Sequence, residues 1–116
     1  MPDAENLRDR VVATLDELKG FDLKVLDVRK LTPLTDYMVL ASGTSERHVR
    51  ALARTLIEKA KDWGQVPLGV EGDREGEWAL VDLNDVVVHV MLPRVRDFYQ
   101  LERLWTVPEQ AGSAVR

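Results

Sequence analysis

Apolar residues recur at steps of three and four positions in two parts of the chain, and this spacing predicts two amphipathic helices. The first spans about residues 4–19, with Gly20 in the position of a C-terminal glycine cap. The second follows the turn at residues 42–45, takes Thr44 or Ser45 as its N-cap and ends at Gly64. Their apolar stripes are Leu7, Val11, Leu15 and Leu18 in the first helix, and Val49, Leu52, Ala53, Leu56, Ile57 and Ala60 in the second.

Short runs rich in branched residues predict about five strands, at residues 23–28, 37–41, 66–70, 77–82 and 85–92. The run at 37–41 is apolar throughout, as in a strand covered on both faces. Pro67 and Gly69 indicate that the third strand lies at a sheet edge. Leu83-Asn84 is expected to form the tight turn between the last two strands, because Asn tolerates the left-handed conformation.

A third helix is predicted from Pro93, which suits a first helical turn. Its inner face would carry Val95, Phe98, Leu101, Leu104 and Trp105. Pro108 ends the pattern, so we expect one domain over residues 1–107 and a flexible tail over 108–116. Three helices and about five strands predict an α/β domain built on a single-layer mixed sheet.

The last two strands are expected to form a ribbon whose two faces differ. If Asp82 pairs with Asp85, one face carries Ala79, Val81, Val86, Val88 and Val90, which suits packing against helices. The opposite face carries Trp78, Leu80, Asp82, Asp85, Val87, His89 and Met91. Three helices can hardly cover both sides of the sheet, so this mixed face is expected to be an interface. The alternative is that Trp78 packs under the neighbouring loop or the last helix.

Composition narrows the possible functions. The 116 residues include 16 basic and 20 acidic side chains, a net charge of −4, which argues against binding to nucleic acid through overall charge. The acidic excess is concentrated between residues 71 and 85, around the ribbon, and suits a basic protein partner. The chain has no cysteine, no apolar run long enough to span a bilayer and no basic region typical of a signal peptide, so we expect a cytosolic protein.

Catalytic and metal-binding patterns are weak. His48 and His89 are the two histidines and lack zinc-site spacing, so no metal and no cofactor is expected. A triad of Ser42, His89 and Asp82 lacks a nucleophile elbow. The Gly43-Thr44-Ser45 turn before a helix could hold phosphate, as in nucleotidyltransferases, but no pair of aspartates follows it to bind magnesium. A nucleotidyltransferase-like enzyme that uses this turn is the alternative hypothesis, and the missing aspartates argue against it.

Three arginines share one stripe of the second predicted helix: Arg47, Arg50 and Arg54. They could make an auxiliary contact with RNA phosphate. The same spacing occurs on the solvated face of any amphipathic helix, and that interpretation is favoured.

Four separated motifs resemble the ribosomal silencing factor (RsfS, or Iojap-like) family, in the same order and with similar spacing. They are the segment D-Y-M-V-L-A-S-G-T-S at residues 36–45, Val70-Glu71-Gly72 with Glu77-Trp78, D-V-V-V-H-V at 85–90, and V-R-D-F-Y-Q-L-E-R-L-W at 95–105. The resemblance runs from about Leu7 to Trp105. It implies a nucleotidyltransferase-like scaffold without the catalytic aspartates, and hence no enzymatic activity.

The resemblance also implies a function and a binding surface. Such proteins bind the large ribosomal subunit at universal ribosomal protein fourteen, block joining of the small subunit and repress translation when nutrients are short. The implied contact residues are Trp78, Leu80, Asp82, Leu83, His89, Tyr99 and Glu102. Leu83-Asn84 departs from the Tyr-Gly or Leu-Gly often found at this turn in the family. A homodimer that buries the same sheet face is a further alternative, compatible with ribosome binding.

Overall fold

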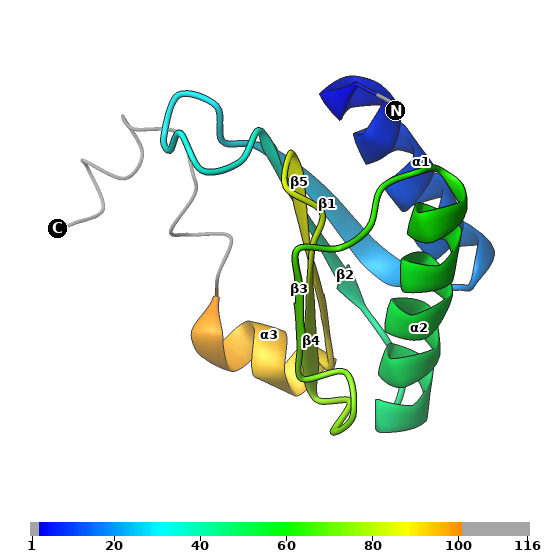
Figure 1. Ribbon diagram of the computed structural model, residues 1–116. Coiled ribbons are helices and arrows are strands. Elements are labelled where there is room, and N and C mark those ends of the chain that lie inside the picture. The colour runs from blue at the N-terminus through cyan, green and yellow to red at the C-terminus, as the bar shows by residue number, and fades with distance from the viewer. Residues whose placement is uncertain (1–2, 101–116) are drawn as a thin grey trace, which may run out of the picture.

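One five-stranded sheet separates two helices from a third in the computed structural model, which describes residues 3–100 (Figure 1). The helices are α1 (Ala4–Glu17), α2 (Glu46–Asp62) and α3 (Pro93–Tyr99). The strands are β1 (Phe21–Asp27), β2 (Tyr37–Ser42), β3 (Gly69–Glu71), β4 (Trp78–Asp82) and β5 (Val86–Met91). Helices α1 and α2 lie on one face of the sheet and α3 lies on the other. The predicted α/β class with a mixed sheet and three helices is confirmed for the described residues.

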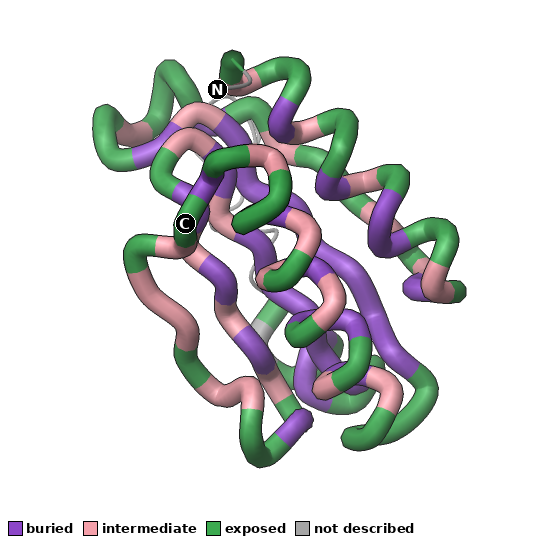
Figure 2. Tube along the Cα trace, turned by 45° about the vertical axis from the view of Figure 1, so that its right-hand side comes forward, coloured by how far each residue is buried: buried purple, intermediate pink, exposed green. Residues whose placement is uncertain are grey.

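The strand order is β1-β2-β5-β4-β3, so the parallel pair β2–β5 forms the centre and the other pairs are antiparallel. All six residues of β2 are buried, as its continuous apolar sequence predicted (Figure 2). Strand β3 is an edge strand of three residues, also as predicted. No helix in residues 3–100 combines the length and apolar character that crossing a membrane requires.

The helix ends agree with the capping signals in one case and differ in another. The Ser45 side chain accepts a hydrogen bond from the backbone N–H of His48, so Ser45 is the N-cap of α2. At the end of α1, Lys19 and not Gly20 adopts the left-handed conformation, with φ of 69°. The Gly20 N–H then bonds to the carbonyl of Leu15, which completes a Schellman motif one residue earlier than predicted.

The β4–β5 register differs by two residues from the prediction. Asp82 pairs with Val87 and Leu80 pairs with His89, because the turn is centred on Asn84-Asp85 and not on Leu83-Asn84. Asn84 is the residue with positive φ, at 76°. Leu83 has 0% of its surface exposed. Burying its side chain stabilises the register in which the β4 arm of the hairpin extends to Leu83. An even shift keeps every side chain on its predicted face.

The third helix is shorter than its apolar pattern predicted. It ends at Tyr99, and Gln100 follows with φ of 50°. Val95 packs inward, but Phe98 is 79% exposed, so its predicted place on the inner face is wrong. Leu101, Leu104, Trp105 and the predicted tail over 108–116 lie outside the described residues.

Candidate protein-binding face

The β4–β5 ribbon has a fully covered face toward α1 and α2. It carries the residues Ala79, Val81, Leu83, Val86, Val88 and Val90, each 0% exposed. These small and branched side chains pack with the apolar stripes of both helices in one core. Leu83 was expected to contact a partner, but its side chain belongs to this core. We therefore correct that expectation and leave Leu83 out of the candidate surface.

The opposite face is open along β4 and closed toward the centre of the sheet. Trp78, Leu80 and Asp82 of β4 are half-buried, and so is Val87 of β5. The residues of the same face nearer the centre are buried: Met38, Leu40, His89 and Met91. The expectation of an uncovered face is therefore correct at β4 and wrong at β2 and in most of β5. The part of this face that a partner could contact therefore lies toward the β3–β4 side of the sheet.

The buried His89 is hydrogen-bonded to the indole of Trp78. The Trp78 Nε1–H donates a hydrogen bond of 3.0 Å to His89 Nδ1, and the two ring centroids are 6.0 Å apart. Only 6% of the His89 surface is exposed, and this burial lowers the pKa of its imidazole to about 4. The histidine is thus neutral near pH 7. Its predicted direct contact with a partner is not supported by this geometry, since the exposed ring is the indole.

A shallow groove adjoins Trp78 where α3 crosses the start of β4. It has a volume of about 350 Å³ and is lined by Glu77, Trp78, Arg94, Val95 and Phe98. Phe98 and Trp78 supply apolar surface, and an ion pair of 3.0 Å joins Arg94 to Glu77 at the rim. Of the two other expected contacts, Tyr99 is the last residue of α3 and Glu102 lies outside the described residues.

Two acidic residues, Glu71 and Asp82, flank this open part of the face. Glu71 pairs with Leu80 across the β3–β4 ladder and so lies on the same face, exposed to solvent. Asp82 lies at the far end of β4, where its Oδ1 accepts a hydrogen bond of 2.9 Å from the Asn84 N–H. Gly72, with φ of +73°, brings the connecting loop against the Trp78 carbonyl so closely that a Cβ would clash. The result is an apolar strip with a carboxylate rim.

The arginine stripe lies on the other side of the molecule. Arg47 and Arg54 are exposed on α2, whereas Arg50 donates a hydrogen bond of 3.3 Å to the Glu75 carbonyl. Helix α2 and the Trp78 face are separated by the sheet (Figure 1). A partner bound at Trp78 would therefore not touch the stripe through the same surface. The RNA contact stays a prediction.

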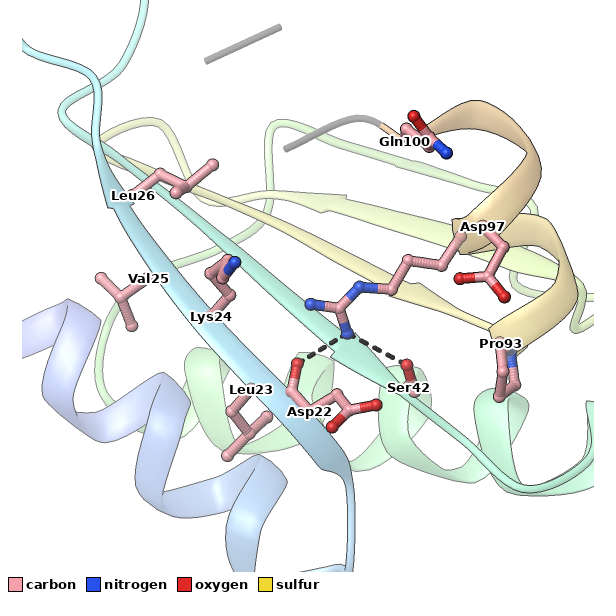
Figure 3. Close-up of a pocket in the computed structure, with 10 residues that line it drawn as sticks. Asp22, Leu23, Lys24, Val25, Leu26, Ser42, Pro93, Asp97 and Gln100 are labelled. Atoms are coloured by element: carbon pink, nitrogen blue, oxygen red, sulfur yellow. Dashed lines mark hydrogen bonds between the residues drawn. The ribbon is translucent and has the colours of Figure 1, made fainter. Parts of the chain in front are cut away.

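The residues of the enzymatic alternatives are not brought together. Ser42 is at the C-terminal end of β2, beside the Trp78 end of β4, whereas Asp82 is at the opposite end of β4. Ser42 Oγ instead accepts a hydrogen bond of 3.0 Å from Arg96, which also bonds to the Asp22 carbonyl (Figure 3). Within residues 3–100, no group of three or more His, Cys, Asp or Glu is arranged to hold a metal ion.

The turn at residues 42–45 is engaged in internal bonds. The Thr44 N–H donates a hydrogen bond of 2.9 Å to His48 Nδ1, and the other ring nitrogen lies 2.9 Å from the Leu18 carbonyl. A backbone donor that could face phosphate is thus used to join α2 to the end of α1. Sequence reasoning missed both this role of His48 and the role of Arg96. The partners of Arg96 are 54 and 74 residues away in the chain, so no local signal identified them.

Comparisons with known proteins agree with the fold and the motifs. The family model described as "Ribosomal silencing factor during starvation" matches residues 1–115. A ribosomal silencing factor of Chromobacterium violaceum is 50% identical over 94 residues, which cover 81% of this chain and 77% of that protein. A mouse protein named mitochondrial assembly of ribosomal large subunit protein 1 is 35% identical over 102 residues, covering 85% of this chain and 45% of that protein.

The fold comparison gives the same result. The crystal structure of a Chromobacterium violaceum protein superposes with a TM-score of 0.88 and 44% identity, covering 92% of this chain and 91% of that one. Sequence and structure thus agree over almost the full length. The chain belongs to the ribosomal silencing factor family.

Proposed function

We propose that this protein represses translation in the cytoplasm by binding the large ribosomal subunit at universal ribosomal protein fourteen and sterically preventing the small subunit from joining. No bond is made or broken, so the protein is not an enzyme. Family membership supports the silencing role, and the name of the mouse relative supports an association with the large subunit. Repression under nutrient limitation follows the description of the family model, which refers to starvation.

The observation that carries the proposal is the half-buried Trp78 on an open apolar strip rimmed by acids. Tryptophan anchors near the centre of an interface often contribute most of the binding energy. The surrounding carboxylates would attract a basic ribosomal protein and select it by charge. An interface of standard size, around 1,600 Å² in total, would suffice to compete with the small subunit.

Direct contacts are assigned to Trp78, Leu80 and Asp82, which share this strip. Tyr99 and Glu102 remain proposed contacts, and they rest on the family resemblance. Exposed Arg47 and Arg54 are proposed to reach ribosomal RNA only if the RNA approaches from the α2 side. A homodimer through the β4 strip would hide Trp78 and compete with the ribosome.

The test is co-sedimentation of the purified protein with isolated large subunits. Trp78→Ala is expected to weaken binding by about 2 kcal/mol, or roughly thirtyfold in affinity. Trp63→Ala is the matched control, because Trp63 is also half-buried but follows α2, on the other side of the sheet. Thermal unfolding of both variants shows whether each is folded. A folded Trp78→Ala protein that binds with wild-type affinity would show that the assigned face is wrong.

Blocking of subunit joining is measured separately on sucrose gradients. Added wild-type protein is expected to lower the fraction of joined ribosomes in a mixture of both subunits, and Trp78→Ala to have a much weaker effect. Binding without any change in that fraction would contradict the steric mechanism. Magnesium-dependent nucleotide incorporation by the pure protein would instead favour the transferase alternative.

A further inference from the structure

We infer that His89 is a positioning residue: its Nδ1 holds the Trp78 indole in a fixed orientation on the sheet, ready for the partner. This inference rests on the proposed function, because it concerns the same binding face. It assigns to His89 a role behind the interface and not in it. The pair couples adjacent strands, with Trp78 on β4 and His89 on β5.

The hydrogen-bond chemistry fixes the state of the imidazole. The indole Nε1–H can only donate, so the Nδ1 atom that lies 3.0 Å from it must carry a free lone pair. A neutral imidazole carries one proton, which therefore resides on Nε2. Protonating Nδ1 would place two N–H groups against each other and break the bond. Burial of His89 favours the neutral ring and so preserves the acceptor.

The orientation matters because the indole is only partly supported by packing. Trp78 is half-buried, and its ring adjoins the open groove beside Arg94 and Phe98. A bond to one edge of the ring restricts rotation about the two side-chain torsions, so less rotational freedom is lost when a partner binds. The rings are tilted by 45° and 6.0 Å apart, so they are not stacked, and the hydrogen bond is the directional contact between them.

Two substitutions separate this role from simple packing. His89→Asn places an amide oxygen near the position of Nδ1 and keeps an acceptor, whereas His89→Leu fills the space and removes it. We expect His89→Leu to weaken binding to large subunits by about five- to tenfold, as loss of one hydrogen bond would. His89→Asn is expected to stay within about threefold of wild type.

A double-mutant cycle tests whether His89 acts through the indole N–H. Trp78→Phe keeps an aromatic ring but has no donor for Nδ1. When His89→Leu is added to Trp78→Phe, it is expected to change the affinity by less than about twofold. If His89→Leu instead weakens binding equally with and without the indole donor, the positioning role is overturned.

A second readout is independent of the ribosome. In ¹H–¹⁵N spectra the Trp78 indole signal, assigned by its absence from Trp78→Phe, should exchange slowly with solvent in the wild type and in His89→Asn. It should exchange faster in His89→Leu. If His89→Leu leaves the signal unchanged, the positioning role is wrong. If the wild type fails to bind large subunits but this pattern holds, the proposed function is wrong and the internal bond stands.

Discussion

The two faces of the β4–β5 ribbon are made by alternate residues of the same strands, yet they differ in burial and composition. On the face toward α1 and α2, every ribbon residue is fully buried and apolar. On the other face, half-buried Trp78, Leu80, Asp82 and Val87 stand beside the buried His89. The first face is constrained by packing volume, whereas the second combines an aromatic, an acid and aliphatics that can meet another surface.

The difference shows how a small domain can expose a mixed surface without weakening its core. Side chains alternate across a strand, so changes on one face leave the other face almost untouched. The separation depends on helices α1 and α2 lying on a single side of the sheet (Figure 1). Substitutions at neighbouring positions of one strand therefore test the comparison directly.

The largest contrast is expected between Val88→Asp and Val87→Asp on β5. Val88 is fully buried and pairs with Val39 and Val81, so an aspartate there would bury an unpaired charge. We expect a loss of about 5 kcal/mol or more, enough to prevent folding. Val87→Asp should cost about 1 kcal/mol, because that position reaches solvent. Circular dichroism during thermal unfolding measures both, and equal losses would remove the distinction between the faces.

A smaller contrast is expected between Leu83→Ala and Leu80→Ala. Leu83 is fully buried, so its truncation should lower the free energy of unfolding by about 3 to 4 kcal/mol. Leu80 is half-buried, and its truncation should cost about 1 kcal/mol of stability while weakening large-subunit binding by a similar amount. Urea unfolding and co-sedimentation give the two quantities. Binding that is insensitive to Leu80→Ala would narrow the interface to the vicinity of Trp78.

Acid should destabilise the folded protein by protonating His89, which lies on the mixed face. Its pKa is about 4 in the folded protein and about 6.5 when unfolded, so below pH 6.5 the unfolded state binds more protons. Keeping His89 neutral therefore contributes about 3 kcal/mol to the free energy of unfolding. This contribution is complete above pH 6.5 and is lost as the pH falls toward 4. Urea midpoints measured across this range should fall less steeply for His89→Asn than for the wild type. Parallel slopes for the two proteins would mean that His89 does not titrate in this way.

The smallest effect is expected from Asp82→Asn. The amide keeps the oxygen that accepts the Asn84 N–H, so stability should change by less than about 0.5 kcal/mol. Removing one rim charge should slow association with large subunits by about two- to threefold at low salt. At high salt the difference should disappear because ions screen the charge. A rate that depends on salt equally in both proteins would show that Asp82 does not steer the encounter.

Features set by neighbouring residues could be predicted from the sequence. The helix periodicities, the Ser45 cap and the continuous apolar run of β2 depend on residues a few positions apart. The face of each ribbon residue was also predictable, because side chains alternate between the two faces along each strand. A two-residue error in the β4–β5 register therefore left each side chain on its predicted face, and the candidate surface changed only where burial removed Leu83 and His89 from it.

Features set by distant residues could not be predicted in the same way. His89 is buried because the sheet centre is covered, although its strand pattern is equally typical of an exposed position. Phe98 follows the helical spacing of Val95, yet Phe98 is exposed and Val95 is buried. The bonds of Arg96 connect α3 to β1 and β2 (Figure 3). Tertiary packing decided each of these, and local patterns carry no information about it.

The parallel pairing of β2 with β5 has a consequence for biosynthesis. Each paired residue lies 49 positions from its partner, as Tyr37 and Val86 illustrate. During synthesis, β2 and its apolar side chains are therefore made well before β5, which flanks them in the folded protein. The hairpins β1–β2 and β4–β5 can form early from nearby segments, but their union is a late, long-range event. Nascent chains of this protein should accordingly need protection of β2 until synthesis nears its end.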